Sequence, residues 1–199
     1  MNRHILDFLL GAILIAGCGE NQRATTVHAD TTKAADTKKN YFPVYDYLKS
    51  EIAFVDSFPL RIIHYHTDNG KTDSSFAQFP AFNQMAREFL DPALMSPDFE
   101  NDFSETSFLD QTSQSLTFTY SSKNSRTGLR RVDVLATPGL GFDKVKSIYE
   151  EKITLQHDTS IIKKLYWKAR RNFQVITITQ VGSRPAVASQ SRVVWDNQP

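Results

Sequence analysis

A strict alternation of apolar and polar residues, beginning at Ser115, constrains the fold of this chain more than any other feature. Leu116, Phe118 and Tyr120 alternate there with Thr and Ser, which places successive side chains on opposite faces of a strand. Similar runs, separated by turn residues, lie at 129–136, 144–155, 160–168, 172–181 and 189–195. Six short strands at regular spacing predict an antiparallel meander.

The segment before the alternation predicts two helices and a hairpin. Apolar residues recur at helical spacing over 43–57, and residues 80–90 repeat that pattern after a proline. Between them, residues 60–67 are expected to form a strand that returns through about Phe76 after an Asp-Asn-Gly turn. The fold class is therefore predicted to be α+β: two N-terminal helices with a short hairpin, packed on an antiparallel meander sheet of about six strands.

The last strands are apolar on both faces. Phe173 and Val175 lie on one face of their strand, and Ile176 and Ile178 lie on the other. A sheet with one face in water alternates more cleanly, so we expect both faces to be covered at least in part. Three coverings remain open: the acidic, Phe-bearing segment 91–114 wraps the second face, a curved sheet holds an apolar ligand, or a partner protein docks there.

Composition and charge exclude several classes of protein. The 199 residues include 23 Lys or Arg and 22 Asp or Glu, and a net charge of +1 lacks the basic footprint of nucleic-acid binding. The single Cys excludes an intrachain disulfide framework. The near-neutral balance averages two unlike halves, because residues 41–115 have a net charge of −8 and residues 116–199 one of +8. We expect these halves to attract each other within the fold or to orient a partner.

The N-terminus indicates a secretory signal. Residues 1–17 combine a basic start with nine uncharged residues, too few to span a bilayer core of about 30 Å. Ile15-Ala16-Gly17-Cys18 resembles the lipobox of bacterial lipoproteins, in which the Cys follows the cut and receives diacylglycerol and usually an acyl group such as palmitate. The resemblance implies an envelope lipoprotein held by a covalent lipid on Cys18. The alternative is a core helix over 5–16 followed by a buried thiol.

Residues 18–40 are predicted to be the lipidated Cys and a flexible tether, followed by a single globular domain over 41–199. Residues 19–40 contain no aromatic residue, Leu or Ile, so they cannot bury enough apolar area to offset the entropy of ordering. Such a chain has a root-mean-square reach of about 25 Å. Gly19 at the second mature position, where some lineages use Asp for inner-membrane retention, favours the outer membrane, and we expect the domain to face the periplasm.

The sequence contains no nucleophile elbow, Walker loop, H-E-x-x-H motif or paired-Cys metal spacing, so we assign no catalytic residue. His64 and His66 are weak metal-ligand candidates, because residues two apart on a strand point to one face. A third ligand would come from Asp68, Asp73 or His157. The alternative interpretation places both imidazoles on the solvent side of the strand.

Five basic side chains gather around one predicted hairpin. They are Lys163, Lys164, Lys168, Arg170 and Arg171. Outside the cytoplasm, lipid headgroups or the phosphates of lipopolysaccharide are natural partners for such a patch. The alternative is that these residues protect the strands against edge pairing.

These observations predict a noncatalytic lipoprotein of the outer membrane whose domain acts as a binding or assembly module for an envelope protein, with no cofactor and no nucleic-acid partner. The main alternative is a carrier of an apolar or acylated ligand, lined by Tyr166, Trp167, Ile176 and Ile178. In the order of its helices and strands, the body is similar to periplasmic carriers and acceptors of lipoproteins, whose half-open sheet shelters acyl chains. It also resembles uncharacterised small envelope lipoproteins of Gram-negative bacteria, which implies no activity. An unrecognised enzyme is the third possibility.

Overall fold

The computed structural model describes residues 41–58, 61–124, 128–139 and 141–195. They belong to the second of the chain's two units, Lys39–Pro199. The predicted signal peptide, Cys18 and the tether lie outside the described residues. Within the described ranges, no helix is long and apolar enough to cross a bilayer.

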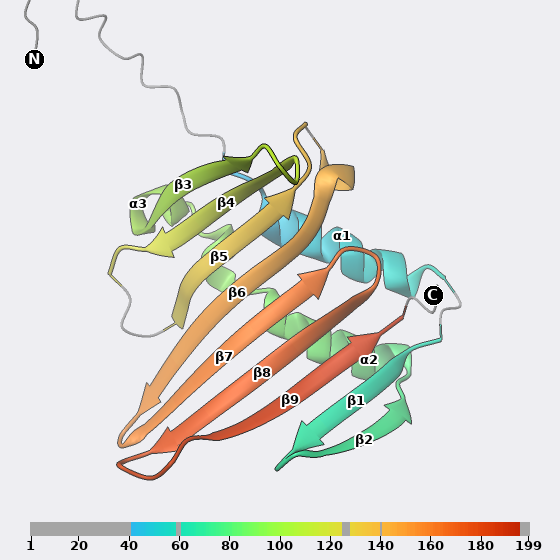
Figure 1. The fold of residues 1–199 in the computed structure, drawn as a ribbon, viewed down its shortest axis with the longest axis vertical. Helices are drawn as coiled ribbons and strands as arrows, with labels where there is room; N and C mark the ends of the chain where they lie inside the picture. The colour runs from blue at the N-terminus through green and yellow to red at the C-terminus, as the bar shows by residue number, and fades with distance from the viewer. Residues whose placement is uncertain (1–40, 59–60, 125–127, 140, 196–199) are drawn as a thin grey trace, which may run out of the picture. The chain divides into compact units, whose positions relative to one another are not determined.

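Nine antiparallel strands form one open sheet in the order β2-β1-β9-β8-β7-β6-β5-β4-β3 (Figure 1). The strands are β1 (Ile63–Asp68), β2 (Lys71–Phe76), β3 (Phe103–Asp110), β4 (Ser115–Ser122), β5 (Gly128–Ala136), β6 (Val145–Gln156), β7 (Thr159–Lys168), β8 (Asn172–Val181) and β9 (Val187–Val194). From β3 to β9 each strand pairs with the next in the chain, which makes a meander. β9 then pairs with β1, so the N-terminal hairpin extends the same sheet.

The α+β class and the meander are confirmed, and the strand count is corrected from about six to nine. The six predicted strands correspond to β4–β9, and the predicted hairpin corresponds to β1–β2. The prediction that the hairpin packs on the sheet is wrong. The hairpin is part of the sheet, because β1 pairs with β9. β3 was not predicted, because its apolar residues are diluted by Ser, Glu and Thr.

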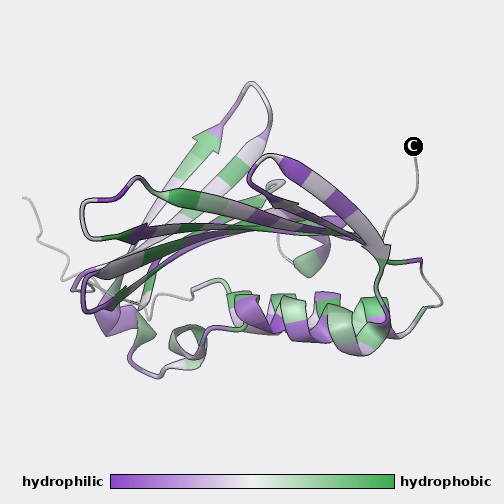
Figure 2. Cartoon of the chain, turned by 90° about the horizontal axis from the view of Figure 1, so that it is seen from below, coloured by the Kyte–Doolittle hydropathy of each residue, from purple (hydrophilic) through white to green (hydrophobic). Residues whose placement is uncertain are grey.

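The helices lie together on one side of the sheet, which we call the helix face (Figure 2). They are α1 (Val44–Asp56), α2 (Phe79–Ala86) and α3 (Phe99–Asp102), with the 3-10 turns η1 (Arg87–Phe89) and η2 (Pro92–Met95) between α2 and α3; a third 3-10 turn, η3 (Phe142–Lys144), follows β5. The helix predicted at 43–57 is α1, whose apolar stripe is buried against the sheet. The helix predicted at 80–90 is α2 followed by the tighter turn η1.

The core between the helices and the sheet is built mainly from aromatic rings. Trp167, Phe173 and Trp195 from the sheet meet Phe82 and Phe89 from the helical layer, with ring centroids 5.2–6.0 Å apart. All five side chains have at most 2% of their surface exposed. Aromatic pairs at these distances contribute about 0.5–1.5 kcal/mol each beyond the area they bury, so this cluster fixes the helices on the sheet.

Candidate functional site

The side of the sheet opposite the helices, which we call the outer face, has no described helix over it (Figure 2). The strand register places Tyr149 beside Tyr166 in one row across this face. A neighbouring row joins Ile153, Ile162 and Ile178. These isoleucines are half-buried, and Tyr166 is 40% exposed. The outer face therefore presents aromatic and aliphatic side chains to the surroundings.

The prediction that segment 91–114 wraps this second face is wrong. Phe103 lies on the helix face with 4% of its surface exposed, and its ring stacks on Phe99 at 4.4 Å. Phe108 points to the other side of the edge strand β3 and is 69% exposed. The segment supplies an edge strand rather than a cover, and its pairing with β4 satisfies the backbone groups that face β4.

The four residues predicted to line a ligand site do not lie together. Tyr166, Ile176 and Ile178 share the outer face, as the register of β7 and β8 shows. Trp167 is on the helix face, fully buried in the aromatic core. It is therefore a structural residue, and the lining set is reduced to the other three.

Positive charge predominates on the outer face. Asp133 is paired with Arg131 at 2.9 Å, and Glu151 accepts a hydrogen bond from the Tyr149 hydroxyl at 3.2 Å. Burial and the nearby Glu151 charge raise the pKa of Tyr149 to about 12, so this hydroxyl remains a donor. Three further side chains have no ion pair within the described part of the chain. They are Lys164, Lys168 and Arg192.

The predicted basic patch is divided between the two sides of the sheet. Lys163 pairs with Glu88 of the helical layer at 2.6 Å, and Arg170 pairs with Glu51 of α1 at 3.0 Å. These two cations are thus committed to holding helices on the sheet. Lys164 belongs to the outer face, because neighbouring residues in a strand point to opposite sides.

His64 and His66 point to one face as predicted, but it is the face on which the helices lie. The His64 Nε2 atom is 2.8 Å from the Ser191 hydroxyl, and that hydroxyl is 3.9 Å from the sulfur of Met85 in α2. Burial, and then the nearby His66, lowers the pKa of His64. Among the described residues, no group of three His, Cys, Asp or Glu side chains is arranged to hold a metal ion. The solvent-side interpretation is therefore wrong for His64, and the pair has no third ligand in that part of the chain.

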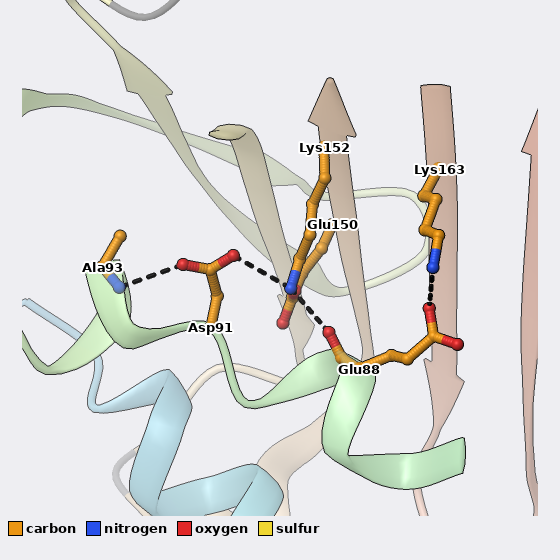
Figure 3. Close-up of polar contacts among 6 residues, drawn as sticks. All are labelled: Glu88, Asp91, Ala93, Glu150, Lys152 and Lys163. Carbon is orange, nitrogen blue, oxygen red and sulfur yellow. Dashed lines mark hydrogen bonds and ion pairs between the residues drawn. The ribbon is translucent and has the colours of Figure 1, made fainter. Parts of the chain in front are cut away.

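A cluster of charged side chains lies where η1 and the residues after it pack on β6 and β7 (Figure 3). Lys152 Nζ lies 3.1 Å from Asp91 and 3.3 Å from Glu150, and it donates to the Glu88 carbonyl oxygen at 2.6 Å. The Glu88 carboxylate in turn accepts from Lys163. The cluster thus ties the segment after α2 to two strands.

Glu150 is the buried member of this cluster. None of its side-chain surface is exposed, and neither oxygen accepts a well-formed hydrogen bond from a described residue. Burial raises its pKa to about 8 in spite of Lys152, and the charge of Asp91 adds to that rise. Carboxyl groups with raised pKa values are common in active sites, but a reacting group needs access to substrate. Because Glu150 is fully covered, we interpret the cluster as structural and sensitive to pH.

A second buried carboxylate, Glu51 of α1, is fully engaged. Its Oε2 atom accepts hydrogen bonds from the Trp167 indole at 3.2 Å and from the Arg170 backbone N–H at 2.8 Å, and its Oε1 atom lies 3.0 Å from Nε of Arg170. The Arg170 guanidinium also pairs with it and lies 3.8 Å from the centroid of the Phe54 ring. Glu51 therefore fastens α1 to the turn between β7 and β8.

An apolar pocket of about 320 Å³ lies beside the start of α1. Its walls include Phe42, Phe118, Ala136 and Phe142, with Lys144 among the lining residues. Gly141 shapes this wall: its φ is +115°, and a Cβ there would lie 2.6 Å from an Asp143 oxygen. The sequence pattern did not predict this pocket, because its walls come from three separate segments.

Comparison with protein-family models, with curated proteins and with solved structures finds no match to this chain. Function is therefore inferred from the two faces of the sheet and from the N-terminal sequence.

Proposed function

We propose that this chain is a lipid-anchored protein of the bacterial envelope, attached through Cys18, whose folded unit is a noncatalytic binding module. The observation that supports the module is the outer face, where tyrosines and isoleucines lie side by side without a covering helix. Tyr and Arg are the residue types that most often dominate binding at protein interfaces. The lipobox-like sequence supports the anchor, and Gly19 at the second mature position supports the placement in the outer membrane, where we expect the module to face the periplasm.

The partner that fits the outer face is a protein with an acidic rim around an apolar centre. Lys164, Lys168 and Arg192 surround the apolar rows, while the acidic residues of this face already have partners. Two copies of this face would bring like charges together, which disfavours self-association through it. Electrostatic complementarity therefore favours an acidic envelope protein.

Site-specific photocrosslinking in intact cells tests this proposal. A photoreactive amino acid in place of Tyr166 should give one adduct whose crosslinked peptide is rich in Asp and Glu. The charge reversals Lys164→Glu and Lys168→Glu should weaken that adduct several-fold. The same photoreactive group in place of Lys49, exposed on α1, is the matched control. Three results would contradict the proposal. They are equal crosslinking at both positions, no adduct at position 166, and an adduct that the charge reversals do not weaken.

A carrier of an apolar or acylated ligand is the second candidate, and the pocket beside α1 favours it. The pocket lies near the lower end of the 300–1,000 Å³ typical of small-molecule sites. A hydrophobic dye should bind there and be displaced by a fatty acid. Ala136→Leu should fill the pocket and abolish dye binding, whereas Ala188→Leu on β9 should leave it intact. Dye binding that is absent, or unchanged by Ala136→Leu, would eliminate the carrier.

A further inference from the structure

Five large apolar side chains are exposed near one end of the sheet, which we call the rim, against two, Leu155 and Val187, near the opposite end. In this antiparallel sheet β2, β3, β5, β7 and β9 end at the rim, and the other four strands begin there. The rim comprises Phe58 (48% exposed), Phe76 (67%), Phe108 (69%), Leu109 (49%) and Phe142 (38%). The turns at the opposite end are polar, with Asn69-Gly70, His157-Asp158 and Gly182-Ser183 at their tips.

Cationic side chains lie among the apolar residues of the rim. The Arg61 guanidinium is 4.5 Å from the centroid of the Phe76 ring, and Lys168 ends β7 at the same edge. Phenylalanine beside Lys and Arg is the composition of surfaces that sit at the boundary between headgroups and acyl chains.

Three acidic residues of the rim that the structure describes are engaged by neighbouring groups. Asp143 pairs with Lys144 at 2.8 Å, and Asp56 accepts both of its hydrogen bonds from the Asn83 amide. Asp110 is held by the Ser113 hydroxyl and by backbone N–H groups, which lower its pKa. The three described carboxylates of the rim are matched in number by the cations Arg61, Lys144 and Lys168, so the described part of the rim carries no excess of negative charge that would repel an anionic membrane.

The chain that leads from Cys18 enters the folded unit beside the rim. Tyr41 and Phe42 line the same pocket as Phe142, and the Phe42 and Phe142 rings are 5.8 Å apart. Leu109 lines a neighbouring hollow with Thr137 and Pro138, which belong to the segment between β5 and β6 that also carries Phe142. The 22 residues between Cys18 and Tyr41 span at most about 75 Å, so a membrane that holds Cys18 is always within reach.

We propose that the rim docks on the phospholipid surface in which Cys18 is anchored, with the Phe and Leu side chains inserted at headgroup level. This inference rests on the proposed lipid anchor. Attachment through a tether makes docking an intramolecular event, so a few apolar side chains suffice where they would not hold a free protein. The strands would then point away from the membrane, and the outer face would stand beside it, open to a partner.

Fluorescence quenching by lipids tests the docking directly. The full lipidated chain is reconstituted into phosphatidylcholine vesicles that contain nitroxide-labelled lipid. Because Cys18 is the chain's single cysteine, one new Cys carries an environment-sensitive dye. Gln111→Cys places the dye in the turn next to Phe108 and Leu109. Asp158→Cys places it in the turn beyond β6, at the opposite end of the sheet. At about 3.3 Å per residue, the length of β6 separates the two ends by roughly 35 Å.

We expect the dye at position 111 to be quenched several-fold more strongly than the dye at position 158. Phe108→Ser with Phe142→Ser should remove most of that difference, whereas the matched pair Leu155→Ser with Val187→Ser at the polar end should preserve it. Equal quenching at both positions, with lipid on Cys18 confirmed by intact mass, would overturn the docking and leave the anchor standing. An unmodified Cys18 would overturn the anchor, and the docking with it.

Discussion

The two faces of the sheet are built from the same strands but have different roles. Trp167 and Tyr166 are neighbours in β7, yet the first is fully buried under the helices and the second is 40% exposed. The helix face uses large aromatic rings and engaged carboxylates to fix one packing arrangement. The outer face has apolar side chains of similar kind but no described element that covers them. Apolar content alone therefore does not distinguish a core from a binding surface; the covering layer does.

The largest difference between the faces should appear in stability. Trp167→Ala removes a ring from the centre of the core and should lower the free energy of unfolding by about 3–5 kcal/mol, the range for buried aromatic truncations. Tyr166→Ala, one position away on the outer face, should cost less than about 1 kcal/mol. Urea denaturation of both variants measures the contrast, and similar losses would show that the outer face is packed as tightly as the core.

Loss of the Glu51 carboxylate should have the next largest effect. Glu51→Ala leaves the Trp167 indole and the Arg170 N–H without their acceptor and removes the anion that pairs with the guanidinium. We expect a loss of about 3 kcal/mol, because two covered donors lose their acceptor at about 1–3 kcal/mol each, while the half-exposed Arg170 guanidinium can return to water. Lys49→Ala, on the exposed side of α1, should change stability by less than about 0.5 kcal/mol. A neutral Glu51→Ala would mean that this contact does not hold α1 on the sheet.

Glu150 should give the helix face a characteristic dependence on pH. Its pKa is raised from 4.5 to about 8 by folding, so between these values the folded chain keeps a proton that the unfolded chain releases. The free energy of unfolding should therefore fall as pH rises through this window, by up to about 1.4 kcal/mol per unit. Glu150→Gln should flatten the slope, and Glu151→Gln on the outer face should keep it. The lowered pKa of His64 contributes a slope of opposite sign in both proteins, so the same slope in the wild type and in Glu150→Gln would refute the assignment.

The smallest effect on stability is expected from the isoleucines of the outer face. Ile176→Thr keeps a β-branched side chain on a half-buried position, so we expect a change below about 1 kcal/mol. The same substitution should nevertheless weaken the photocrosslinked adduct at position 166 several-fold, because it removes an apolar contact from the partner. If Ile176→Thr destabilises the protein as much as Trp167→Ala does and leaves the adduct unchanged, the outer face is a packed core and not a binding surface.

The sequence predicted the local elements well, because each has its own period. Alternation predicted β4–β9, and helical spacing predicted α1 and α2. The pairing of β9 with β1 was not predictable in this way, since it joins segments more than 120 residues apart. The edge strand β3 was missed for a related reason: its burial is slight, so its pattern is weak.

The assignment of faces was the weakest part of the sequence prediction. Alternation separates Glu150 from Glu151 but does not say which of them points to the helices. The same ambiguity placed Trp167 in a ligand site and His64 on the solvent side of its strand. Such choices depend on which side the helices cover, and that is decided by packing across the whole sheet. The anchor at Cys18 lies outside the described residues and remains a prediction from its sequence.

Hydroxyl-radical footprinting of Tyr166 in intact envelopes and in the purified chain tests the central claim most directly. If the outer face is open in the isolated protein and occupied by a partner in the envelope, oxidation of Tyr166 should be fast after purification and several-fold slower in envelopes. Met95, exposed in the helical layer, should be oxidised at the same rate in both. Equal rates for Tyr166 in the two preparations would contradict the assignment of this face as a binding surface.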